Sequence, residues 1–231
     1  MAKRGDGIQT QKRILRVCVK LFLENGFHNT TTSQILKDAQ VSSSSLQNLF
    51  HNKDGILMEL VKTMFENQFD IARKVAGSEL PPVYVYAAET AIQITLTELN
   101  ENLRDIYLEA YTGERTLDYI QKATAKELKE IFGAYQPELT EQDFYSLELG
   151  TAGLMRGYMA NPCTEEFTLE QKLNAFLALA LRCYKVPEDE IAKVLSYIAG
   201  LDIRKLARSV MEELFEKLAM RYEFSLEGLL P

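Results

Sequence analysis

The sequence predicts an all-α protein with a small N-terminal head of three helices and a larger C-terminal helical bundle. Apolar residues recur at helical spacing along nearly the whole chain of 231 residues, and no segment alternates as a half-buried β-strand does. Many of the 12 Gly and 6 Pro fall at the breaks between these periodic segments. Hydrophobic residues make up 46% and charged residues 26%, a globular composition that excludes disordered, collagen-like and low-complexity classes.

The three helices of the head follow from local start and stop signals. The first helix ends at Asn25-Gly26, a common C-cap sequence. A threonine run offers the N-cap of a short helix over residues 32–39. After a turn at 40–42, a second short helix over 43–50 takes its cap from a serine. These signals predict two short helices joined by a tight turn and preceded by a supporting helix.

The rest of the chain reads as a continuous series of helices. A long helix begins at Asp54, whose charge suits a helix N-terminus, and runs to about residue 75. The segment from Leu173 to Tyr184 is apolar on nearly every side, so we expect its helix to lie at the centre of the bundle. Further helices are predicted at 83–100, 102–111, 115–133, 140–160, 168–184, 187–199 and 202–223. The chain thus divides into a head, residues 1–53, and a body, residues 54–231.

Charge separates the same two parts. Residues 1–53 carry eight Lys or Arg against three Asp or Glu, a net charge of +5, whereas the remainder carries −12. A basic head on an acidic body indicates a polyanionic partner for the head, although a solvated basic face without a partner is the alternative. The sequence contains no apolar run of membrane-spanning length, no leader-like segment and no disulfide pattern among its three Cys. We therefore expect a cytoplasmic protein without a membrane partner.

The two short helices predict a helix-turn-helix reader of the DNA major groove. The second helix is polar on its leading face, where serine hydroxyls suit phosphate contacts, and Gln47 and Asn48 suit paired hydrogen bonds to adenine. Leu46, Leu49 and Phe50 are expected to anchor this helix to the core. On spacing alone, a surface corner between two helices with a serine-rich cap is the alternative.

Residues 8–60 resemble the N-terminal domain of the tetracycline-repressor (TetR) family of transcriptional regulators. The resemblance rests on the run from Leu21 to Thr32 and, after it, on Ile35, Ala39, Val41-Ser42, Leu46, Phe50 and Lys53-Asp54. It implies a homodimeric, ligand-responsive regulator, usually a repressor. Carried over by position, it places Thr31 and Ser33 against a phosphate and Lys53 at a backbone-contacting position. It assigns to the DNA-facing helix Ser43, Ser44, Ser45, Gln47, Asn48 and Leu49.

One position of the turn departs from this family. Gln40 stands where glycine is common, so a positive φ there would place a non-glycine residue in an unfavourable region.

All 11 Tyr lie in the body, where a ring with one hydrogen-bonding tip suits a pocket for an amphipathic small molecule. Ordinary core packing is the alternative for each of them. The candidate pocket residues come from the long helix and from the tyrosines: Met64, Phe65, Phe69, Tyr86, Tyr107, Tyr111, Tyr119 and Tyr158. The acidic body slightly favours a cationic or neutral effector over an anionic one.

A stripe of small residues marks the predicted helix over 140–160. Ser146, Gly150, Gly153 and Gly157 fall on one face, although each glycine inside a helix costs about 1 kcal/mol relative to alanine. Close approach of another backbone compensates for that cost, either across a dimer axis or from a helix of the same chain. We expect a dimer interface here, completed by the helix over 168–184 or the one over 202–223.

An enzyme is not predicted. The two histidines, His28 and His51, both lie in the head, so the body can form neither a histidine metal cluster nor a Ser-His-Asp triad. Nucleotide-binding and nucleophile-elbow motifs are absent from the sequence, and no cofactor, metal or catalytic site is expected.

The predicted function is therefore a ligand-responsive transcriptional regulator that reads a double-stranded operator as a homodimer. The helix from Asp54 is the one evident mechanical connection between head and body, and a small-molecule effector that tilts it would change operator affinity. An architectural or protein-binding helical protein that reads no DNA sequence is the alternative.

Overall fold

The computed structural model describes residues 2–76 and 80–223, with side chains described for residues 7–64 and 80–223. These ranges contain helices and short connections, and no strand occurs in them. The helices are α1 (Ala2–Asn25), α2 (Thr32–Ala39), α3 (Ser43–Phe50), α4 (Lys53–Ala76), α5 (Pro82–Leu99), α6 (Glu101–Ala110), α7 (Glu114–Phe132), α8 (Glu141–Ala160), α9 (Leu169–Cys183), α10 (Glu188–Ala199) and α11 (Ile203–Tyr222). The all-α prediction is confirmed, because each predicted helix occurs and its bounds differ by about one residue.

Side-chain caps explain why several helices begin where they do. Thr31, Thr140 and Thr168 each accept a hydrogen bond from the backbone N–H three residues later, and each is the first residue of a capping box. Each box satisfies donors of the first turn that would otherwise lack partners.

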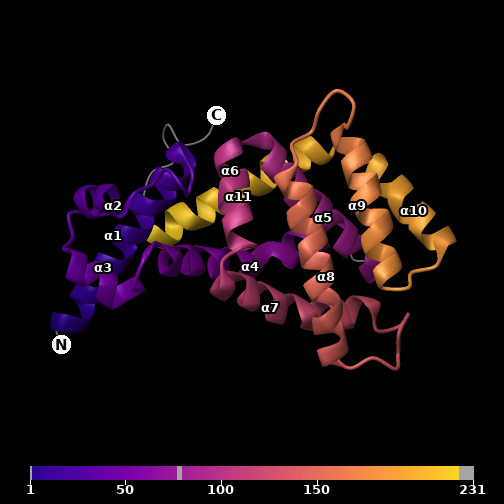
Figure 1. The fold of residues 1–231 in the computed structure, drawn as a ribbon, viewed down its shortest axis with the longest axis horizontal. Helices are drawn as coiled ribbons and strands as arrows, with labels where there is room; N and C mark the ends of the chain where they lie inside the picture. Colours follow the sequence, from indigo (N-terminus) through magenta and orange to yellow (C-terminus); the bar gives the residue numbers. More distant parts are fainter. Residues whose placement is uncertain (1, 77–79, 224–231) are drawn as a thin grey trace.

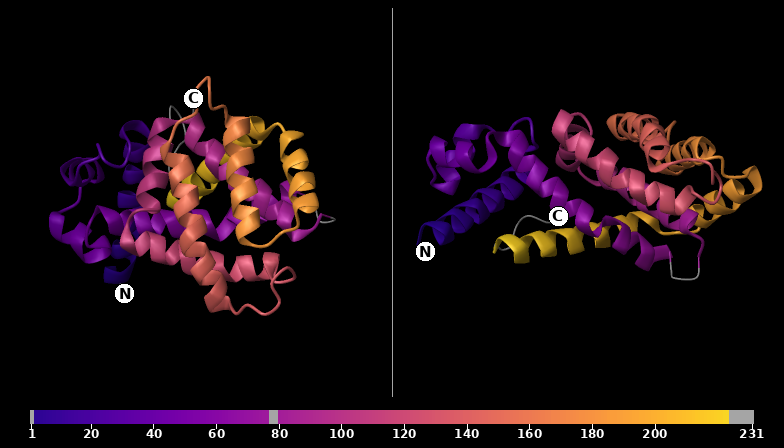
Figure 2. Two further views of the ribbon diagram at one scale, coloured as in Figure 1. Left: turned by 45° about the vertical axis from the view of Figure 1, so that its right-hand side comes forward. Right: turned by 90° about the horizontal axis from the view of Figure 1, so that it is seen from below.

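The molecule is elongated, with the head at one end and the body at the other (Figure 1). Helices α1–α3 form the head, and α4 runs from the head into the body. Helix α11 returns from the far side of the body towards the head, next to α4, as the second view of Figure 2 shows.

Helix α5 is the centre of the body. Every residue from Val83 to Thr97 except Tyr84 is buried, and α5 packs against α4 and all the helices from α6 to α11. The expectation that the helix over 168–184 is central is wrong, because α9 keeps an open face on which Leu179 is 45% exposed. The apolar residues of that open face are available for an intermolecular contact instead.

A buried ionic cluster joins α5, α6 and α9. Lys172, whose side chain is fully buried, donates to Glu98 at 2.6 Å and to the carbonyl of Asn161, and Arg104 donates to the same carboxylate at 3.1 Å. Burial tends to raise the pKa of Glu98, but the hydrogen bonds and positive charges around it hold that pKa below its ordinary value. The cluster therefore keeps its carboxylate ionised in the protein interior.

Within the part of the chain that the structure describes, head and body are joined in three places. Helix α4 is continuous between them, as predicted. In addition, α11 ends against α1, where Glu223 pairs with Lys12 and its carbonyl accepts from Arg16 at 3.2 Å. The loop between α1 and α2 also contacts α6. The expectation that the helix from Asp54 is the one mechanical connection is therefore wrong, because side chains far apart in sequence make the other two.

Candidate DNA-binding surface and sensing cavity

Helix α3 presents a polar face to solvent and an apolar face to the head. Leu46 and Phe50 are each 3% exposed and pack into the core. On the opposite side, four residues of the predicted DNA-facing set are exposed: Ser43, Ser44, Gln47 and Asn48. Leu49 lies with them at 36% exposure, so its expected role as a core anchor is wrong.

Ser42 caps α3, and its neighbours complete a hydroxyl cluster at the helix start. The Ser42 hydroxyl accepts from the Ser45 N–H at 3.1 Å and lies 2.9 Å from the hydroxyls of Ser44 and Ser45. Ser45 is half-buried, whereas Ser43 and Ser44 are exposed. The first turn of α3 thus offers hydroxyls and free N–H groups on one surface, a combination that suits phosphate oxygens.

The turn before α3 contains Gln40, a non-glycine residue for which a positive φ is unfavourable. Gln40 caps α2 in the left-handed region with φ 51°, and its N–H donates to the carbonyls of Leu36 and Lys37. The protein accepts an uncommon backbone conformation at a non-glycine residue in order to close this turn.

The start of α2 lies on the surface. Thr31 and Ser33 are both exposed, and Thr31 is the N-cap, bonded to Gln34 through a reciprocal pair. The partial positive charge of a helix N-terminus favours an anion near these two residues.

Lys53 is held inside the head rather than extended into solvent. Its Nζ donates to the carbonyls of Phe27 at 2.7 Å and Thr30 at 2.9 Å, and it lies 4.1 Å from the centre of the Phe27 ring. Partial burial lowers the pKa of Lys53, and nearby Asp54, Glu109 and Asp105 oppose that shift. With its ammonium occupied in this way, Lys53 braces the α1–α2 loop that leads into Thr31.

Sequence reasoning missed a close contact between α3 and α4. A Cβ on Gly55 would lie 1.8 Å from the carbonyl oxygen of Phe50, so only glycine allows the first turn of α4 to approach the end of α3. This close contact constrains the angle between α3 and α4.

The body encloses a small polar cavity of about 30 Å³. Side chains from several helices surround it: Tyr86, Glu89, Thr90, Gln93, Tyr111, Thr124, Glu148, Thr151, Ala152, Met155 and Phe176. This volume is roughly the volume that one molecule occupies in liquid water. A larger molecule can therefore enter only if the surrounding side chains or helices move.

Two carboxylates in this lining are almost completely buried. Glu89 is 4% and Glu148 6% exposed. Gln93 donates to Glu89 and accepts from the Tyr111 hydroxyl at 3.1 Å. Thr151 donates to Glu148 at 2.7 Å.

Burial raises the pKa of both carboxyl groups. It raises the pKa of Glu148 to about 7, although hydrogen bonds from Thr151 and Tyr184 oppose the shift. The pKa of Glu89 is also well above its ordinary value, first because of burial and second because of the negative charge on Glu148. A positive charge in the cavity would stabilise both ionised forms.

Two of the five tyrosines predicted for a ligand pocket lie in the lining of this cavity. Tyr86 and Tyr111 line it, whereas Tyr107 is buried beside it, and Tyr119 and Tyr158 are half-buried outside the lining. Met64 is half-buried against the core; Phe65 and Phe69 lie outside the residues whose side chains are described. The buried acids were missed because a Glu in a helix ordinarily faces solvent.

The glycine stripe lies on an open face of α8. A Cβ added to Gly150, Gly153 or Gly157 would meet no atom within 4 Å, and Ser146 is also exposed. Packing against a helix of the same chain, one of the two explanations of the stripe, is therefore excluded within the described residues.

Neither a metal site nor a membrane-spanning helix is found among the described residues. They contain no group of three or more His, Cys, Asp or Glu arranged to hold a metal ion. None of their helices combines the length and apolar character that crossing a bilayer requires.

Comparison with known proteins identifies the head. Residues 14–60 match the model of the bacterial regulatory proteins of the tetR family. The HTH-type transcriptional regulator HbdR of Aromatoleum sp. (strain CIB) is 30% identical over 98 residues, which cover 39% of this chain and 43% of HbdR. The uncharacterized HTH-type transcriptional regulator YvkB of Bacillus subtilis (strain 168) is 32% identical over 68 residues, which cover 29% of this chain and 36% of YvkB.

The chain thus matches less than half the length of either curated relative. Among solved structures, Salmonella enterica GusR aligns with 81% of this chain and 95% of its own, at 18% identity and a TM-score of 0.47. The family match covers the second half of α1, α2, the exposed polar helix α3 and the start of α4. The match thus identifies residues 14–60 as similar to the helix-turn-helix domain of the tetR family of bacterial regulatory proteins.

Proposed function

We propose that the protein is a transcriptional repressor that binds operator DNA as a homodimer and is released by a small molecule. The observation that carries this proposal is the division of α3, with Leu46 and Phe50 buried in the head and Gln47 and Asn48 exposed. An amide on an exposed helix face can make two hydrogen bonds to an adenine edge in the major groove. Thr31 and Ser33 would contact phosphate at the start of α2, and Lys53 would support them through the α1–α2 loop.

We expect Gln47→Ala and Asn48→Ala to relax base preference. Loss of a paired base contact costs about 1–3 kcal/mol, and the cost should concentrate on particular base pairs. The operator is first selected from random duplexes with the wild-type protein, and each variant is then titrated against single-base variants of it. Gln142→Ala, which removes an exposed amide of the body, is the matched control. Equal weakening on operator and scrambled duplexes would contradict base reading by these residues.

A homodimer fits the open surface of the body. One short recognition helix reads too few base pairs for useful specificity, whereas a twofold dimer places two of them about 34 Å apart, or a multiple of it. The exposed face of α8 carries the glycine stripe and Leu149, which is 49% exposed, and the adjacent open face of α9 carries Leu179. We propose that α8 and α9 pair with the same helices of a second copy.

We further propose that the cavity of the body is the effector site and that its effector is an amphipathic cation. Two buried carboxylates suit an ammonium group, and the rings of Tyr86, Tyr111 and Phe176 suit cation–π and apolar contacts. Because the closed cavity has a volume of only about 30 Å³, binding would separate the helices around it. Helix α4 packs against α5 and α7, so this movement would reach the head.

We expect hydrophobic amines to raise the melting temperature more at pH 8 than at pH 5.5. The pKa of Glu148 is about 7, so the carboxyl group is mostly neutral at pH 5.5 and mostly ionised at pH 8, where it attracts a cation. Glu148→Gln should reduce this pH difference, whereas Glu166→Gln, which changes an exposed acid, should keep it. Equal stabilisation by neutral or anionic amphipaths would contradict the cationic class. Amines that stabilise the protein should also weaken operator binding, typically by a factor of 5–150.

A further inference from the structure

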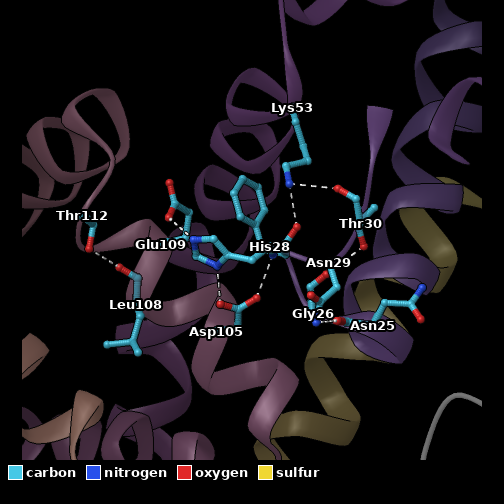
Figure 3. Close-up of polar contacts among 11 residues, drawn as sticks. Asn25, Gly26, His28, Asn29, Thr30, Lys53, Asp105, Leu108, Glu109 and Thr112 are labelled. Carbon is cyan, nitrogen blue, oxygen red and sulfur yellow. Dashed lines mark hydrogen bonds and ion pairs between the residues drawn. The ribbon is translucent and has the colours of Figure 1, made fainter. Parts of the chain in front are cut away.

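The α1–α2 loop of the head is held by one face of α6 in the body (Figure 3). The His28 N–H donates to Oδ2 of Asp105 at 2.9 Å. Its ring Nδ1 lies 2.5 Å from Oδ1 of the same residue, and its Nε2 lies 3.4 Å from Oε2 of Glu109. One turn earlier, Asn102 donates to the carbonyl of Leu23 at 2.7 Å. The contacting side chains follow helical spacing, so they form a single stripe along α6.

This arrangement suits a doubly protonated imidazole ring. An imidazolium donates a hydrogen bond at both nitrogens, whereas a neutral ring donates at one and turns a lone pair towards the other carboxylate. The ammonium of Lys53 lies on the carbonyls of Phe27 and Thr30 in the same loop. Among the described residues, the charged groups that contact this loop include Asp105 and Glu109 from α6 and Lys53 from α4. The contact between α6 and His28 is therefore stronger when both ring nitrogens carry a proton.

Hydrogen bonds and close packing also fix the loop to the head. Gly26 closes α1 with φ +80°, and a Cβ there would lie 2.8 Å from Oδ2 of Asp105. Thr30 is fully buried, and its hydroxyl bonds to the carbonyls of Leu21 and Gly26. The next residue, Thr31, caps α2. The contacts of His28 are thus two residues from Thr30, which is bonded inside the head, and three residues from the N-cap of α2.

The same helix reaches the cavity at its other end. Helix α6 has 10 residues and is therefore about 15 Å long. Tyr111, its C-cap, lines the cavity and donates to Gln93. A short helix thus touches the head along one face and the sensing cavity at its end.

We propose that His28, Asp105 and Glu109 position the DNA-binding head: α6 holds the α1–α2 loop through a proton-dependent contact that pre-organises the head for its operator. The proposal rests on the proposed DNA-binding function and adds a connection from the cavity to the head that is separate from α4. Fixing the head before binding removes part of the ordering cost of association. A protonated His28 ring makes charge-assisted hydrogen bonds to both carboxylates, so operator affinity is expected to exceed that of a chain without the histidine.

The first test compares operator affinity at pH 6 and pH 8 in the full chain. His28→Gln keeps the main-chain N–H bond to Asp105 but cannot take up a proton. We expect it to bind the selected operator roughly threefold to tenfold more weakly than wild type at pH 6, and within about twofold at pH 8. Asp105→Asn should show the same pattern, and the double variant should lose no more than either single one. His51→Gln, at the only other histidine in the sequence, is the control and should keep the wild-type pH profile.

The second test needs no DNA. Amide hydrogen exchange of residues 26–31 should accelerate at least fivefold in Asp105→Asn at pH 6, whereas exchange in α3 should stay unchanged. Identical pH profiles in wild type and His28→Gln, stronger operator binding by His28→Gln, or unchanged exchange in the loop would each overturn the proposal. Failure of the wild type to prefer any selected duplex would instead refute sequence-specific DNA binding, and the exchange result would then decide the contact alone.

Discussion

A leucine in place of Gly153 is expected to abolish dimerisation and to leave the protomer folded. A Cβ at this position meets no atom within 4 Å of the same chain, so the longer side chain has room in the protomer. Removing a glycine from a helix interior also gains up to about 1 kcal/mol of helix stability. Across a twofold axis, however, the same side chain would separate two closely packed α8 helices. Because a dimer binds both half-sites together, the loss of one partner should weaken operator binding by a factor of about 10²–10⁴.

Sedimentation at micromolar concentration measures the oligomeric state, and far-UV circular dichroism measures retention of the fold. Gly153→Ala is the matched control, because its single methyl group adds helix propensity with little bulk and should keep the dimer. Gly157→Leu, one turn along the same stripe, should behave as Gly153→Leu does. A wild-type protein that sediments as a folded monomer would refute the interface on α8.

Glu98→Leu is expected to destabilise the protein by about 3–5 kcal/mol, since it leaves a buried ammonium group without its carboxylate. The side chain of Lys172 is fully buried, and Glu98 is its carboxylate partner at 2.6 Å. A cost of this size lowers the melting temperature of a domain of this length by roughly 10 °C. Chemical and thermal unfolding measure both quantities.

The double variant Glu98→Leu/Lys172→Met should recover a large part of that loss, because replacing both partners removes the unpaired charge. Lys193→Met is the control. It breaks the exposed pair between Lys193 and Asp189, and should change stability by less than about 1 kcal/mol. A Glu98→Leu protein that unfolds within about 1 kcal/mol of wild type would show that the cluster does not hold α5, α6 and α9 together.

Local signals explain why the helices of the head could be predicted from sequence. The cap at Thr31, the stop at Asn25-Gly26 and the serine cap of α3 act within a few residues of the backbone groups that they satisfy. The same holds for the outward face of α3, since Leu46 and Phe50 define the buried side and their spacing defines the exposed one. Such features depend on helix geometry alone.

Burial of polar residues in the body could not be predicted in this way. Glu89 and Gln93 are four residues apart on α5, a spacing that ordinarily marks a solvated helix face. They are buried because other helices surround α5 on every side, and no local signal reports how many neighbours a helix has. The predicted centre of the bundle was wrong for the same reason. The apolar residues of α9 form the same sequence pattern whether the helix packs against its own chain or against another molecule.

By itself, the sequence determined the order and bounds of the helices, the all-α fold and the polar face of α3, because each of these depends on residues within one or two helical turns. Only the tertiary structure decided which charges meet. It placed His28 against Asp105 across 77 residues of chain, turned the ammonium of Lys53 into the head, and brought Glu98 and Lys172 together in the core. The physical reason is that the energy of a charge depends on its burial and on its neighbours in space, and both are set only when the helices pack.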